Sequence, residues 1–136
     1  MKLPFEIKSI KYDDVYDNLF IPQNKGWQGG DVAHSIELND KRILWLFGDT
    51  FIGNNDYGQR KVLFPHINNS LAITRKITGS NIDLKFYWKN KDGPPSSFFP
   101  SLNKTPDIYY WPTNGLLIKE NLIILCFSIQ GNFNGK

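Results

Sequence analysis

Residues 31–50, which read DVAHSIELNDKRILWLFGDT, decide the fold class of this chain. From position 31 to 38 apolar and polar residues alternate, a pattern typical of a β-strand with one buried face. The sequence NDK at 39–41 is a turn signal, and positions 42–49 are apolar in both alternating sets. The sequence therefore predicts an antiparallel hairpin whose second strand lies between two packed layers.

The rest of the chain carries the same kind of pattern. Ile occurs 15 times and Leu 13 times but Ala only twice, a composition that favours strands over helices. The polar sequence GNNDYG at 53–58 is typical of a loop, and the proline-rich stretch 89–106 is typical of a long irregular connection. The predicted fold class is all-β and antiparallel, with four further strands at 67–74, 84–88, 115–118 and 122–129.

Length and charge limit the class of protein. The chain has 136 residues, which fits a single β domain, and a net charge of +3. Its lysines and arginines form no dense stripe, so we expect no nucleic-acid partner. No apolar run approaches the ~20 residues that cross a bilayer, so we expect no membrane segment. The first residues lack the apolar stretch of a signal peptide, which favours the cytoplasm.

Cysteine and histidine offer little chemistry. The single Cys126 lies in an apolar run, so we expect a buried, inert thiol. His34 shares a predicted strand face with Ile36, which favours a histidine within the core over a ligand. The two histidines form no metal motif and no phosphate-binding glycine loop is present, so we expect neither a metal nor a cofactor.

One stretch resembles a known family. Residues 26–53, GWQGGDVAHSIELNDKRILWLFGDTFIG, with NNSLAIT at 68–74, are similar to the opening blade of five-bladed β-propellers related to glycoside hydrolases, in particular an uncharacterised bacterial glycosidase-like domain family. The sequence YYWPTNGLLIKENLIIL at 109–125 resembles the start of a second blade. The resemblance implies a leading segment (1–26), a first blade (27–90) and the start of a second blade (107–130). A propeller has at least four blades, so it implies a fragment of a larger protein; a small complete β-sandwich is the alternative.

The resemblance also implies a site. Glycoside hydrolysis commonly uses two carboxyl groups, and the candidates are Asp31 and Asp49. Asp31 follows two glycines and, by resemblance, lies where the central channel opens; a turn aspartate is the equal alternative. Asp49 is more readily a residue that bonds backbone amides and locks its loop. The candidate substrate-binding residues are Trp27, His66, Asn69, Trp111 and Asn114, with ordinary packing as the alternative for both tryptophans.

These observations predict a carbohydrate-active, glycosidase-like domain with a glycan ligand. In such relatives the proton-donating acid is expected on a later blade, and this chain has Asn114-Gly115 where the second blade usually has Asp-Gly. Hydrolysis by the 136-residue chain is therefore not expected. The alternatives are a non-catalytic carbohydrate-binding or scaffolding domain and a truncated, non-functional product. Exposed strand edges would also permit self-association.

Overall fold

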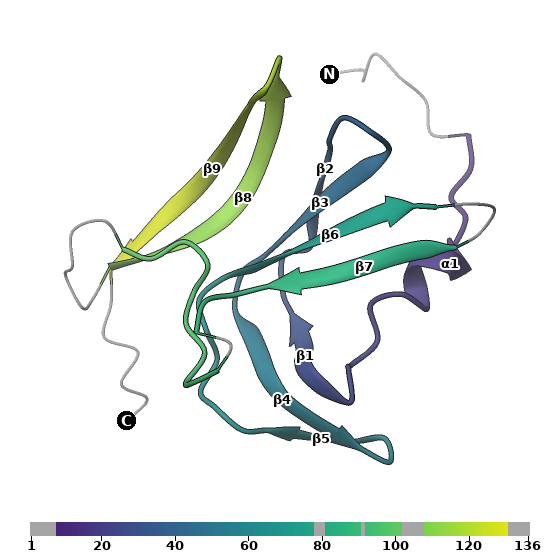
Figure 1. Ribbon diagram of the computed structural model, residues 1–136. Coiled ribbons are helices and arrows are strands. Elements are labelled where there is room, and N and C mark those ends of the chain that lie inside the picture. The colour runs from purple at the N-terminus through teal and green to yellow at the C-terminus, as the bar shows by residue number, and fades with distance from the viewer. Residues whose placement is uncertain (1–7, 78–80, 91, 102–107, 131–136) are drawn as a thin grey trace.

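The computed structural model describes residues 8–77, 81–90, 92–101 and 108–130 (Figure 1). These residues form one short helix and antiparallel strands, so the predicted all-β, antiparallel fold is confirmed. The elements in chain order are α1 (Asp14–Asp17), β1 (Lys25–Gly30), β2 (His34–Glu37), β3 (Arg42–Phe47), β4 (Thr50–Asp56), β5 (Gln59–Val62), β6 (Ser70–Lys76), β7 (Ile82–Tyr87), β8 (Ile108–Ile118) and β9 (Asn121–Gln130).

The strands of the described part of the chain form three sheets. A four-stranded sheet has the order β2-β3-β6-β7, a three-stranded sheet has the order β1-β4-β5, and β8 pairs with β9. Figure 1 shows the three-stranded sheet at one end of the four-stranded sheet, and the β8–β9 hairpin along its side. The chain passes between the first two sheets three times, from β1 to β2, from β3 to β4 and from β5 to β6.

Strand β3 has a core on each face, which confirms the prediction of two packed layers. Leu44 and Leu46 belong to one buried cluster, and Phe47 belongs to another. Because successive side chains of a strand point to opposite faces, this one hydrophobic strand serves both clusters. Their other buried members are Ile36 and Leu71 in the first cluster, and Trp27, Ala72 and Phe86 in the second.

Trp45 is half-buried, whereas a strand packed on both faces predicts nearly complete burial. Its ring contacts Tyr16 and Phe20, with ring centroids 5.4 and 4.8 Å away, and its Nε1 donates to Thr74 Oγ1 at 2.9 Å. Tyr16 lies in the single turn of α1 and Phe20 in the connection that follows it. This layer is too short to cover the whole indole.

The stretch 53–58 is not a loop: it supplies the end of β4 and the turn into β5. The turn is confined to Tyr57 and Gly58, which both have positive φ. Asn54 and Asn55 have low strand propensity, but their backbone pairs with β5, and Asn54 also pairs with Lys25 of β1. Pairing on both sides overrides the local preference of the residues.

The predicted strand 31–38 is regular only at 34–37. Val32 and Ala33 have positive φ values of 72° and 40°, so the chain turns here before β2 begins. His34, which we expected in the core, is exposed. It opens a four-residue edge strand in which only Ile36 is buried, so it extends past the end of the cluster.

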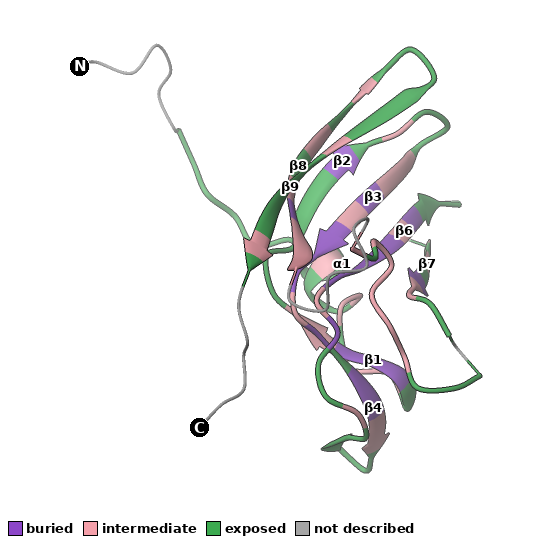
Figure 2. Cartoon of the chain, turned by 90° about the vertical axis from the view of Figure 1, so that its left-hand side faces the viewer, coloured by how far each residue is buried: buried purple, intermediate pink, exposed green. Residues whose placement is uncertain are grey.

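The β8–β9 hairpin is largely exposed, as the green and pink colouring in Figure 2 shows. Cys126 of β9 is exposed, so the expectation of a buried thiol is wrong. The reason is that the hairpin rests on the four-stranded sheet through few side chains, among them Ile124, and nothing in the described part of the chain covers its outer face. The apolar run around Cys126 therefore forms a strand that is largely exposed.

Candidate functional site

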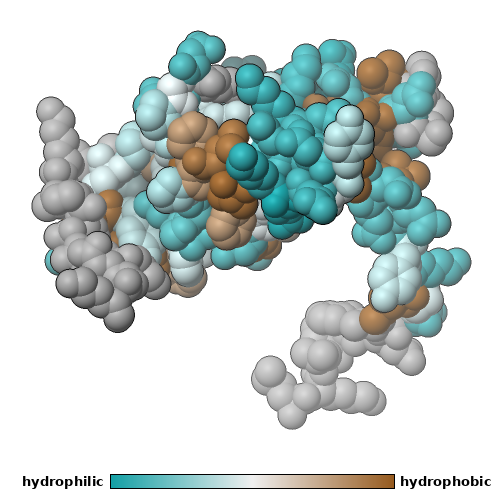
Figure 3. All heavy atoms as spheres, turned by 90° about the horizontal axis from the view of Figure 1, so that it is seen from below, coloured by the Kyte–Doolittle hydropathy of each residue, from teal (hydrophilic) through white to brown (hydrophobic). Residues whose placement is uncertain are grey.

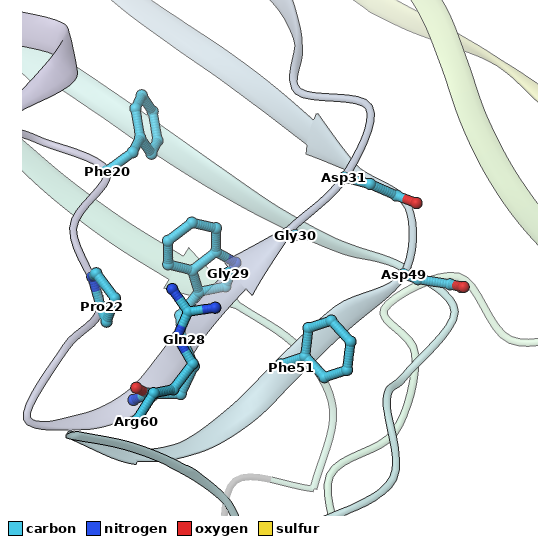
Figure 4. A pocket seen from close by; sticks show the side chains of 10 residues that line it. Phe20, Pro22, Gln28, Gly29, Gly30, Asp31, Asp49, Phe51 and Arg60 are labelled. Atoms are coloured by element: carbon cyan, nitrogen blue, oxygen red, sulfur yellow. The ribbon is translucent and has the colours of Figure 1, made fainter.

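Asp31 and Asp49 occupy two of the three corners where the chain crosses between the three-stranded and the four-stranded sheet. Asp31 directly follows β1, and Asp49 lies in the two-residue link between β3 and β4. The N–H of Asp31 donates to the carbonyl of Asp49 at 3.1 Å, and the N–H of Gly48 donates to the carbonyl of Asp31 at 3.1 Å. The corners are thus bonded to each other, and Figure 4 shows both carboxyl groups pointing the same way.

Thr50 locks the β3–β4 corner. Its buried hydroxyl donates to the carbonyl of Gly48 at 2.8 Å and therefore accepts from Ser70 Oγ, also at 2.8 Å. Its backbone exchanges two hydrogen bonds with Ile67, at 2.8 and 2.9 Å. The locking role that the sequence predicted for the side chain of Asp49 is therefore filled by the next residue.

The other corner is held by a tight turn with an unfavourable backbone. The N–H of Ala33 donates to the carbonyl of Asp31 at 2.9 Å, and Val32 between them has a φ of 72°. A β-branched residue rarely adopts positive φ, at a cost on the order of 1–3 kcal/mol. The backbone hydrogen bonds of Asp31 to Ala33, Gly48 and Asp49 hold this conformation.

The side chain of Asp49 joins the corner to the third sheet. Trp111 of β8 donates from Nε1 to Asp49 Oδ1 at 2.9 Å. The other oxygen, Oδ2, lies 3.7 Å from Nε2 of His66, whose ring contacts Phe51. Asp49 thus brings together two of the residues that the sequence proposed as substrate-binding, Trp111 and His66.

The pKa of the Asp31 carboxyl group is raised. Partial burial raises its pKa above the ordinary value of 3.8, and the negative charge of Asp49 raises it further. Hydrogen bonds from the backbone of Asp49 and of Asp31 itself lower the pKa, as does the charge of His66, but they do not outweigh the first two causes. Tyr109 of β8 has a raised pKa for the same two reasons, burial first and then the charge of Asp49.

Both carboxyl groups line an open depression of about 560 Å³. Its floor includes the backbone of Gly29 and Gly30, at the end of β1. Aromatic rings and one cation complete its wall, and Figure 4 shows them around the floor. The wall residues besides the two aspartates are Phe20, Pro22, Trp27, Gln28, Phe51 and Arg60.

Two of the proposed substrate-binding residues are buried. Trp27 is 4% exposed and stacks on Phe86 with ring centroids 4.5 Å apart, so it presents little more than an edge to the depression. Asn69 is fully buried: its amide donates to the carbonyls of Phe99 and Tyr110 and accepts from the N–H of Phe99. Asn69 therefore has no surface to offer a ligand and instead ties the chain after β7 and β8 to β6.

Asn114 does not line the depression. We expected it to converge with Asp31, Asp49 and Trp27, but it is absent from the lining of the depression that those three share. It is exposed at a bulge in β8, and its Oδ1 accepts the N–H of Gly115. Its side chain therefore forms a hydrogen bond within the bulge.

Sequence reasoning missed Arg60, Phe51, Phe20 and Tyr109. Arg60 and Phe51 belong to the β4–β5 hairpin, which the sequence did not reveal, so nothing placed them beside Asp31. Phe20 lies in the leading segment, to which no site was assigned. The available signal was the aromatic residue directly after Asp49-Thr50, because alternation along a strand sends that side chain toward the side opposite Thr50.

Two negative findings concern the described residues alone. They contain no group of three or more His, Cys, Asp or Glu side chains that could hold a metal ion. None of their helices is long and apolar enough to cross a membrane.

The chain belongs to a family described as a domain of unknown function (DUF5005), which matches residues 13–136. Among solved structures it is similar to a protein from Bacteroides ovatus described as a "putative hydrolase", with a TM-score of 0.70 and 19% sequence identity. The similarity covers 87% of this chain and 34% of that one, so this chain spans about a third of that protein. At this identity the likeness concerns the fold. No curated protein matches the sequence.

Proposed function

We propose that the depression is a carbohydrate site and that Asp31 and Asp49 form a carboxyl pair of the kind used in glycoside hydrolysis. The observation that carries the proposal is the placement of both carboxyl groups at hydrogen-bonded corners on the wall of one depression, and the raised pKa of Asp31 agrees with it. Two carboxyl groups in unlike environments can divide the roles of proton donor and charged partner. The similar structure is described as a "putative hydrolase", which agrees with a hydrolytic reaction.

We further propose that the chain is part of a larger, propeller-like protein. Support comes from small antiparallel sheets arranged around shared corners, and from the similar structure, of which this chain covers 34%. In that case residues outside the chain would complete the site, and turnover belongs to the complete gene product.

A non-catalytic sugar-binding domain is the second candidate. The observation that favours it is the engagement of Asp49, whose two oxygens already face Trp111 Nε1 at 2.9 Å and His66 Nε2 at 3.7 Å. A carboxylate held this way acts well as a tether between sheets. Aromatic rings at the depression, such as Phe51, would then supply most of the contact with a sugar.

The test compares Asp31→Asn with the unaltered complete gene product on a panel of oligosaccharides. We expect release of reducing ends to fall at least about 100-fold, because an amide cannot exchange the proton, while binding changes little. Asp56→Asn, at the exposed end of β4, controls for the loss of one charge. Full activity of Asp31→Asn would remove it from catalysis. Binding without turnover by either protein supports the second candidate, and no binding of any sugar overturns the carbohydrate site.

A further inference from the structure

Arg60 adds a positive charge to the depression. Its side chain extends from the exposed strand β5, and among the described residues no acidic group lies within ion-pair distance of it. In Figure 4 the guanidinium group lies on one side of Phe51 and the carboxyl groups of Asp31 and Asp49 lie on the other. The depression therefore has a cationic end and an acidic end.

The floor beneath Arg60 lacks side chains. Gly29 has a φ of 154°, and a Cβ placed there would lie 3.5 Å from Nη1 of Arg60, in the space under the guanidinium group. A Cβ on Gly30 would come within 3.1 Å of Phe47 and Thr50. Glycine at position 29 therefore keeps the floor low beneath the guanidinium group, whereas glycine at position 30 allows close packing on the buried Phe47 and Thr50.

We propose that Arg60 binds the anionic group, a carboxylate or a sulfate, of an acidic sugar; this rests on the carbohydrate site proposed above. A guanidinium group presents a planar fork of donors that fits such an anion with two hydrogen bonds and cannot lose its charge. In Figure 4 the guanidinium group lies apart from the two carboxyl groups, so the charged group of the sugar lies at the Arg60 end. The bond to be attacked then lies at the Asp31 end.

An acidic sugar fits the two ends better than an amino sugar does. A cationic ligand would need the aspartates, but Asp49 already accepts a hydrogen bond from Trp111 and faces His66. The donors of Arg60 have no such partners in the described part of the chain. Arg60 is exposed, so its guanidinium donors are open to a ligand, and an anionic group is the partner that they bind with charge-assisted hydrogen bonds.

The experiment measures binding to the full chain by isothermal titration calorimetry. One arm uses uronic acid oligosaccharides and their methyl esters, a second uses neutral oligosaccharides with and without sulfate groups, and a third uses an amino-sugar oligosaccharide. We expect at least about tenfold tighter binding of one anionic class than of its uncharged counterpart. The two anionic arms show whether the group is a carboxylate or a sulfate.

Arg60→Gln should abolish the difference between charged and uncharged sugars, and Arg60→Lys should restore only part of it. Lys61→Gln, the exposed neighbour on β5, is the matched control and should keep the preference. Equal binding of charged and uncharged sugars, or tighter binding of the amino sugar, overturns the role of Arg60 but leaves the carbohydrate site standing. If no sugar binds, both proposals fail.

Discussion

At the scale of single residues, the raised pKa of Asp31 makes stability depend on pH in a defined direction. A carboxyl group whose pKa is higher in the folded state than in the unfolded state favours folding while protonated. This contribution is complete below pH 3.8, the ordinary value, and is lost as the pH rises through the higher folded-state pKa. Ionisation of Asp31 therefore works against the fold.

Asp31→Asn should for this reason be more stable than the unaltered chain at pH 7 and equal to it near pH 3. We expect a gain below about 1 kcal/mol, because the side chain is exposed and solvent screens its charge. Urea unfolding at both pH values measures it, with Asp56→Asn as the control. A gain that is the same at both pH values would mean that neither burial nor the charge of Asp49 acts on Asp31.

The sequence revealed only some of the residues that form the site. Asp31 and Asp49 were found because they flank recognisable strands and glycines. Arg60 carried no local signal, because its role depends on β5 folding back along β4, whose other neighbour in the sheet is β1. Asn69 was proposed as a substrate-binding residue through the family resemblance, but only its three buried hydrogen bonds reveal what it does.

At the scale of elements, Asn69 connects three segments of the chain. Asn69→Ala should lower the free energy of unfolding by roughly 2–4 kcal/mol, because it leaves the N–H and C=O of Phe99 and the C=O of Tyr110 without their partner. Asn68→Ala, at the half-buried neighbouring position, should cost under about 1 kcal/mol. Chemical denaturation of both variants gives the comparison, and equal losses would deny Asn69 its connecting role.

The stability of Trp45 variants measures how well α1 and the residues after it pack on β3. Trp45→Ala should cost about 2–3 kcal/mol, less than the 3–5 kcal/mol of a fully buried aromatic, because the ring is only half-buried. Trp45→Phe keeps the ring contacts with Tyr16 and Phe20 but loses the hydrogen bond to Thr74, so it should cost about 1 kcal/mol. Thermal unfolding measures both. A cost below 1 kcal/mol for Trp45→Ala would mean that this layer does not pack on β3.

Elements were predictable where hydrophobic periodicity was strong. The alternating and apolar stretches gave β3, β6, β7 and β9 with small boundary shifts. The strands β1, β4 and β5 escaped because glycine, asparagine and charged residues dominate them, and only pairing with one another makes them strands. Periodicity also failed at Val32, where the corner demands a positive φ in a residue that disfavours it.

At the scale of the whole molecule, the sheets differ in how well they are covered. Both faces of the four-stranded sheet are packed, whereas β8 and β9 expose apolar side chains. Those at least 40% exposed are Leu116, Ile118, Leu122, Ile123, Leu125 and Phe127. Figure 3 shows that hydrophobic residues also reach the surface on the face seen from below, among hydrophilic ones.

The exposed hairpin should make the chain self-associate. A long strand with an unpaired edge and apolar side chains is a surface that other chains can pair with or cover. Leu125→Lys combined with Phe127→Lys should therefore reduce association in sedimentation velocity runs over a range of protein concentrations. The two side chains are 53% and 62% exposed, so the substitution should barely change the melting temperature of the dilute protein.

Tyr57→Lys is the matched control for this prediction. Tyr57 is an aromatic residue that is fully exposed. It lies alone in the turn between β4 and β5 and not on the apolar hairpin. The substitution Tyr57→Lys should leave self-association unchanged, because a single apolar residue at the surface is common in monomeric proteins. If Tyr57→Lys reduces association as much as the hairpin variant, added charge is the cause and the hairpin is not the contact. If neither variant changes it, or if the unaltered chain is monomeric at all concentrations, the hairpin does not mediate self-association.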